Sequence, residues 1–147
     1  MTPLEPLLQP MLDAHPNLPY GWSAAGDELC FNKVGPDGFD IAIAMDSHCL
    51  YLRTEFGLED HWHNRDEAAL KANLKELLGL VRDLLSPAMR LRVLYANGEP
   101  YRWLLEREVG AGWQPEATFG PLFWNYFGRR SEATFSNHCL PRRGFPD

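Results

Sequence analysis

The sequence NRDEAALKANLKELLGLVRDLL, which spans residues 64–85, decides how the rest of this chain is arranged. Its apolar side chains recur at the i, i+3, i+4, i+7 spacing that places them on one face of a helix. They are Leu70, Leu74, Leu77, Leu78, Val81, Leu84 and Leu85. The opposite side carries lysine, arginine and acidic residues. The pattern therefore predicts one long helix that buries a single face against another layer.

The sequence also marks both ends of this helix. Asn64 is a favourable N-cap, and Glu67 stands three residues later, at the position of a capping box. Ser86-Pro87 predicts the end, because the residue before a proline is pushed out of the helical region. Gly79 is the one weak position, with a cost of about 1 kcal/mol relative to alanine.

Segments that read as strands flank the helix on both sides. Apolar and polar residues alternate with period two, and turn residues separate the runs. The expected strands cover residues 29–34, 39–45 and 50–56 before the helix, and 90–95, 101–109, 122–127 and 133–137 after it. Leucines within residues 4–12 add a short N-terminal helix that Pro10 disturbs. We therefore predict a single α+β domain over residues 1–147, with an antiparallel sheet of about six to seven strands and the long helix on one face.

The charge of the chain bears on its partners. The 147 residues carry a net charge of −6, and residues 1–67 hold 12 acidic against 3 basic side chains. Such a protein is a poor general binder of nucleic acid and suits a basic protein partner, although solubility alone also explains an acidic surface. No apolar run has the length of a membrane span. Three cysteines without zinc-ribbon spacing are typical of a cytoplasmic protein with reduced thiols.

The residues just before the helix include a possible set of metal ligands. In an extended segment, His61 and His63 lie on one side and Trp62 on the other. Two such imidazoles can share one divalent metal, with Asp60 as a third ligand or an orienting partner, and His48 if the fold brings it near. A metal-bound hydroxide would make the protein a small hydrolase. Alternatively, the histidines are loop residues, and Trp62 anchors the loop in the core.

Two other arrangements have catalytic and structural explanations. Cys49 follows His48, but neighbours on a strand face opposite ways, so we expect a buried structural thiol and no dyad between these two. Glu106 and Glu108 share a strand face, as a general acid and base could. An exposed sheet edge with Arg102 nearby is the alternative.

The C-terminal third of the sequence is rich in aromatic residues. On the expected strand 122–127, Trp124 and Tyr126 share one face, and Arg129 and Arg130 occupy the adjoining turn. Tyrosine, tryptophan and arginine dominate interface hot spots, so these four residues are candidates for binding a partner or a second copy of the chain. Alternatively, the N-terminal helix covers this face.

One part of the chain resembles known proteins. The segment His61-Trp62-His63 before a helix, followed by the strand pair LRVLYANGEPYRW at residues 91–103, resembles small uncharacterised bacterial proteins. Some of these are similar to immunity proteins that are encoded beside secreted toxins. The lack of a catalytic signature, the acidic N-terminal half and the many aromatic residues predict a non-enzymatic cytoplasmic protein-binding domain without a cofactor, and the resemblance adds that it is an immunity-type inhibitor of a basic protein partner. The metal-dependent hydrolase that uses His61 and His63 is the alternative.

Overall fold

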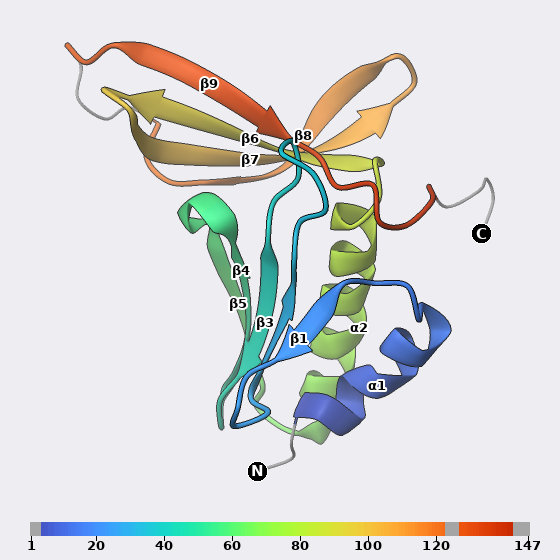
Figure 1. Cartoon of the computed structure of the whole chain (residues 1–147). Coiled ribbons are helices and arrows are strands. Elements are labelled where there is room, and N and C mark those ends of the chain that lie inside the picture. The colour runs from blue at the N-terminus through green and yellow to red at the C-terminus, as the bar shows by residue number, and fades with distance from the viewer. Residues whose placement is uncertain (1–3, 123–126, 143–147) are drawn as a thin grey trace.

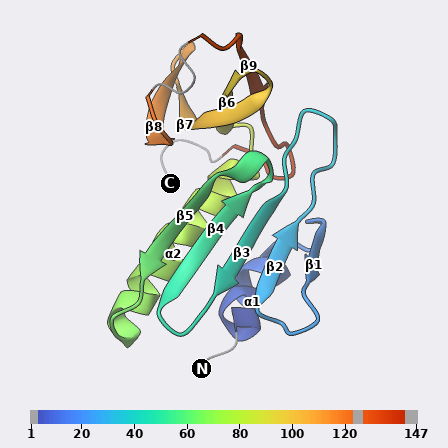
Figure 2. The ribbon, with the colours of Figure 1, turned by 90° about the vertical axis from the view of Figure 1, so that its left-hand side faces the viewer.

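The computed structural model describes residues 4–122 and 127–142. Its first sheet is antiparallel with the order β1-β2-β3-β4-β5, so each strand pairs with the next one along the chain (Figure 2). The strands are β1 (Tyr20–Trp22), β2 (Glu28–Phe31), β3 (Ile41–Met45), β4 (Cys49–Thr54) and β5 (Glu59–His63), with the short turn η1 (Glu55–Gly57) before β5. Two helices, α1 (Leu4–Ala14) and α2 (Glu67–Leu84), lie on one face of this sheet (Figure 1).

A second antiparallel sheet lies across one end of the first sheet and of α2 (Figure 1). Its strand order is β8-β7-β6-β9. The strands are β6 (Met89–Ala96), β7 (Glu99–Val109), β8 (Gly112–Phe119) and β9 (Arg130–Phe135). Asn97 and Gly98 connect β6 to β7 with φ angles of 52° and 80°, the left-handed conformation that a tight hairpin of this sequence requires.

The α+β class is confirmed, but the strands form two sheets where the sequence pattern predicted one. The reason lies in α2, which runs the length of the first sheet and delivers the chain to its far end. Strand β6 therefore begins beyond the first sheet and pairs with β7 and β9 there. The short strands β1 and β5 and the whole of β8 were not predicted, and most of the expected strand 122–127 lies outside the described residues.

The long helix begins three residues later than predicted. Its N-cap is Asp66, whose Oδ1 accepts the N–H of Ala69 at 2.8 Å. Asn64 instead extends the pairing of β5, because its N–H donates to the carbonyl of His48. The predicted end is confirmed, since the helix stops at Leu84, two residues before Ser86.

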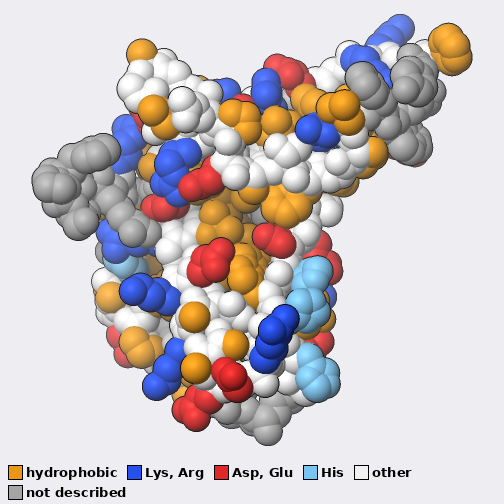
Figure 3. Space-filling model, turned by 180° about the vertical axis from the view of Figure 1, so that it is seen from behind, with side chains coloured by type: hydrophobic (Ala, Val, Ile, Leu, Met, Phe, Trp, Pro, Cys, Tyr) orange, Lys and Arg blue, Asp and Glu red, His pale blue; other side chains and the backbone are white. Residues whose placement is uncertain are grey.

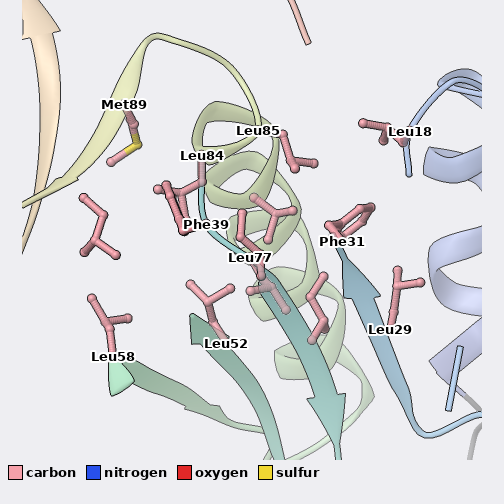
Figure 4. Close-up of a cluster of buried hydrophobic side chains, with 14 of the residues drawn as sticks. Leu18, Leu29, Phe31, Phe39, Leu52, Leu58, Leu77, Leu84, Leu85 and Met89 are labelled. Atoms are coloured by element: carbon pink, nitrogen blue, oxygen red, sulfur yellow. The ribbon is translucent and has the colours of Figure 1, made fainter. Parts of the chain in front are cut away.

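One hydrophobic core joins the helices to both sheets. Leu77, Val81 and Leu84 of α2 are fully buried, as is Leu8 of α1. They pack on the inward side chains of the first sheet, which are Leu29, Phe31, Ile41, Ile43, Leu50 and Leu52 (Figure 4). The same cluster continues into the second sheet through Met89, Leu91, Val93 and Leu105. The two sheets therefore share one hydrophobic core, although none of the described strands pairs across them.

A buried asparagine fastens the end of β9 to the first sheet and to α2. Asn137 is 3% exposed, and its Oδ1 accepts the N–H of Phe39 at 3.1 Å. Its Nδ2 donates to the carbonyls of Phe39 at 3.1 Å and of Leu84 at 3.2 Å. A Cβ on Gly38 would come within 2.8 Å of the Asn137 Oδ1, so this position is restricted to glycine.

Candidate functional site

Strand β5 contributes to two different surfaces, because its side chains alternate between the faces of the first sheet. Asp60 and Trp62 point to the face that α2 covers, where both line a groove. His61 and His63 point to the opposite, uncovered face of the sheet. The residues that the sequence grouped together are thus divided by the sheet.

The groove lies where β5, α2 and the second sheet meet, and its volume is about 590 Å³. Figure 3 shows hydrophobic side chains gathered in a hollow below the second sheet, with acidic side chains around them. The apolar part of the lining comprises Trp62, Ala72, Gly79, Leu80, Met89, Leu105 and Ala117. The polar part comprises Asp60, Lys75, Glu76, Asp83, Arg107 and Glu116. We refer to this surface as the junction groove.

Acidic groups prevail around the junction groove. The guanidinium of Arg107 is occupied by two of them, with its Nη2 2.9 Å from Asp83 Oδ2 and 3.0 Å from Glu116 Oε2. The other charged residues of the lining are the basic Lys75 and the acidic Asp60 and Glu76. Glu76 is exposed on α2, so its carboxylate can contact a bound partner at the groove rim.

The open edge of the first sheet runs along this groove, because β5 pairs with β4 alone among the described strands. Side chains cover part of that edge. Asp60 Oδ1 accepts the N–H of His61 at 2.9 Å, and the Asn73 amide donates to the carbonyl of His63 at 2.8 Å. Such contacts reduce the tendency of an edge strand to pair with other strands. The groove therefore offers mainly side-chain contacts.

The uncovered face of β4 and β5 carries a cluster that was not predicted. Cys49 pairs with His63 across the two strands, and its Sγ lies 3.2 Å from His63 Nδ1. The ring of His61 meets that of His63 edge-on, with 5.0 Å between centroids. Cys49 is buried, as predicted, at 6% exposure. It has an imidazole partner nonetheless, and that partner is His63.

Asp46 and Tyr51 complete this cluster. Asp46 Oδ1 accepts the N–H groups of His48 and Cys49, each at 2.8 Å, and Oδ2 accepts the Tyr51 hydroxyl at 2.8 Å. These bonds, with that of His48 the largest contribution, lower the pKa of Asp46. The hydrogen bonds to Asp46 and then to Cys49 raise the pKa of Tyr51 to about 12, so the phenol stays protonated to a higher pH than an ordinary tyrosine.

The four residues proposed as metal ligands are not all brought together. Asp60 lies on the other face of the sheet from His61 and His63, and His48 is exposed in the turn before β4. Within residues 4–122 and 127–142, no three His, Cys, Asp or Glu side chains are grouped so that they could hold one ion. The metal hypothesis thus lacks a third ligand in this part of the chain.

The residues proposed for partner binding are only partly described. Trp124 and Tyr126 lie outside the described residues. Arg129 and Arg130 are exposed, and the guanidinium of Arg130 stacks over the ring of Tyr101 at 5.0 Å. The N-terminal helix packs on the first sheet, away from the second sheet (Figure 1), and the residues whose cover was in question lie outside the described part of the chain.

The acidic pair of β7 has a structural role. Glu106 is 3% exposed, and its carboxylate lies 2.8 Å from the Arg90 guanidinium and 3.2 Å from that of Arg92. Glu108 pairs separately with Arg142 at 2.7 Å. Strand β7 is central in its sheet, with β8 and β6 on either side, so the predicted exposed edge is wrong. Because arginine neutralises each carboxylate, this pair is poorly suited to act as a general acid and a general base.

Comparison of this chain with models of known protein families, with curated proteins and with solved structures gave no match. Neither described helix combines the length and the apolar character that crossing a membrane requires.

Two features of the structure were not predicted from the sequence, each for a different reason. The junction groove draws on residues from five separate elements, and no local pattern joins them. The Cys49–His63 pair depends on β5, whose polar sequence does not alternate as a strand usually does. The indication in the sequence was Gly57, which has a φ of 97° and ends the turn η1 before β5.

Proposed function

We propose that this protein is a non-enzymatic binding domain whose junction groove receives an apolar and basic segment of a protein partner. The observation that carries the proposal is the composition of the groove, an apolar floor with carboxylates around it. Apolar side chains of a partner would be removed from water on the floor, and its basic side chains would meet Asp60 and Glu76.

The floor supplies the contact area that binding needs. Trp62, Leu80 and Leu105 come from different elements and converge on one hollow. Burying an apolar side chain of the partner there contributes about 1.5–3 kcal/mol, before the cost of association. Two or three such side chains therefore provide most of the affinity, and the charges contribute orientation and speed of encounter.

An immunity-type role follows from this proposal together with the resemblance described above. A protein of that kind inhibits its target by covering a basic site. The acidic N-terminal half of the chain, with 12 acidic and 3 basic residues in positions 1–67, would attract such a site. No cofactor is needed for this activity.

The test compares partners captured by matched variants. Ala72 is exposed on α2 and lines the groove, whereas Ala68 is exposed one helical turn earlier and does not line it. We expect the protein to retain a specific partner from an extract of its native host. Ala72→Arg should abolish that retention, because it places a bulky cation in an acidic groove. Ala68→Arg should leave it unchanged.

A second measurement tests the contribution of charge. Asp60→Asn with Glu76→Gln removes two carboxylates and keeps the side-chain shapes, and Glu99→Gln in the β6–β7 hairpin is the control. We expect the pair to weaken binding by about tenfold, mainly through slower association, and the control to change it little. Equal retention of the partner by wild type and Ala72→Arg would refute the proposed function.

A further inference from the structure

The three cysteines of this chain stand in different surroundings. Burial, with Asp40 and Glu28 adding to it, raises the pKa of the Cys30 thiol, and burial raises that of Cys139. Both thiols are therefore held in the protonated and less nucleophilic form. Cys49 differs in its geometry, since a ring nitrogen of His63 lies within hydrogen-bond distance of its sulfur.

The positions of Cys49 and His63 are fixed from several sides. The N–H of Cys49 is bound by Asp46, and the carbonyl of His63 by the Asn73 amide of α2. Cross-strand pairing sets their side chains next to each other on the uncovered face. The short distance between the Cys49 sulfur and the His63 ring therefore does not depend on flexible side chains alone. A nucleophile and a base held within hydrogen-bond reach are the arrangement that nucleophilic chemistry requires.

Other titratable groups face the same pair. Tyr51 and Asp46 lie on one side of the thiol, and the His61 ring contacts His63. The Tyr51 hydroxyl also belongs to the surroundings of the Cys49–His63 pair, because it interacts with both Asp46 and Cys49. A hollow of about 360 Å³ on the uncovered face is lined in part by Tyr51 and Asp46, which brings solvent next to the cluster.

We propose that Cys49 is a site of oxidation by small hydroperoxides, with His63 as the base that accepts the thiol proton. The site lies on the opposite face of the sheet from the junction groove, so this proposal is independent of the proposed function. The 6% exposure of Cys49 restricts access to small reagents, which is why hydrogen peroxide is the expected substrate class and bulky electrophiles are not.

The proposed reaction balances without a further reactant. The Cys49 S–H proton moves to His63, and the sulfur attacks one peroxide oxygen. An S–O bond forms while the O–O bond breaks. The leaving hydroxide takes the proton from the imidazolium and becomes water. Cys49 is oxidised by two electrons to a sulfenic acid, and the hydroperoxide is reduced to water, or to an alcohol if it is an alkyl hydroperoxide.

The experiment treats the full-length protein with hydrogen peroxide and, at each time point, unfolds it in the presence of dimedone, so that sulfenic acid is trapped whether or not the cysteine was buried. Labelling at each cysteine is then measured by peptide mass spectrometry. We expect Cys49 to be labelled faster than Cys30 and Cys139, although it is the most buried of the three. Labelling of Cys49 at the same rate as the other two, or more slowly, would overturn the proposal. This ranking needs no variant.

Matched histidine variants then test the role of the base. His63→Gln removes the proton acceptor and should slow labelling of Cys49 at least tenfold, within the range for loss of a general base. His15→Gln replaces a histidine in the segment after α1, outside this cluster, and should change the rate less than about twofold. Equal effects of the two variants, in proteins with unchanged thermal unfolding, would show that His63 is not the base.

Discussion

The two sheets of this protein are built from similar antiparallel strands but are held in different ways. The first sheet buries one face under α1 and α2, and its inward side chains are almost all aliphatic or aromatic. The second sheet has no helix of its own over it in the described residues. It relies on a shared core at its inner face, on arginine–carboxylate pairs such as Arg90–Glu106, and on the Asn137 contacts. A sheet that a helix covers can thus be stabilised mainly by apolar burial. A sheet without such a cover, like the second one, also needs polar contacts of defined geometry.

The largest effect is expected in the core under the first sheet. Leu77 is 0% exposed and lies in the middle of α2. Leu77→Ala should lower the free energy of unfolding by about 4 kcal/mol, through lost burial and the cavity that remains. Urea unfolding measures it. A loss below about 1 kcal/mol would mean that the core tolerates a cavity and that α2 is not its main cover.

The next largest effect concerns the connection between the sheets. Asn137→Ala leaves three buried backbone groups of Phe39 and Leu84 without their partner, so we expect a loss of about 3 kcal/mol. Trp22 of β1 reports on the first sheet, and Trp113 of β8, whose ring lies 4.3 Å from the Arg90 guanidinium, reports on the second. In single-tryptophan versions, the fluorescence transitions should coincide for the wild type and separate in the variant. Coincident transitions in both proteins would show that Asn137 does not couple the sheets.

A smaller effect is expected for the ion pairs of the second sheet. Glu106→Gln keeps the shape of a buried side chain but leaves Arg90 and Arg92 without its charge. Both guanidinium groups are partly exposed, so we expect a loss of about 2 kcal/mol, less than for a fully buried pair. Glu132→Gln, which affects an exposed contact of Arg92 at 3.8 Å, is the control and should cost almost nothing.

The smallest effect concerns the uncovered face of the first sheet at high pH. The pKa of Tyr51 is raised to about 12, so its hydrogen bonds are fully present below the ordinary value of 10.0. Their contribution to stability is lost as the pH rises from 10 through 12. Burial also raises the pKa of Tyr95, so absorbance of phenolate should show both Tyr51 and Tyr95 ionising above the ordinary range, and Tyr51→Phe should remove one of these two late groups. A titration unchanged by this substitution would contradict the assignment.

The long strands with one buried face were predictable in both sheets, whereas the short or mostly exposed strands were not, and the reason is physical. Ile41, Ile43 and Leu52 alternate with small or polar neighbours because only one face of their strands is buried, and α2 shows the matching helical period. Strand β8 alternates weakly, because most of its side chains remain exposed. Neither candidate site was predictable from local pattern, since both require residues that tertiary pairing brings together, as with Cys49 and His63.

The position of Asn137 also constrains the order in which this chain is completed during synthesis. Its bonds to Phe39 close a loop of 98 residues, and the one to Leu84 a loop of 53. A ribosome exposes the first sheet and α2 well before it exposes residue 137, since synthesis proceeds at about 5–20 residues per second. For those seconds the Phe39 and Leu84 groups have only water or a chaperone as partner. The first sheet and α2 therefore reach their final stability only after residue 137 has left the ribosome, and that interval is when quality-control factors have access to them.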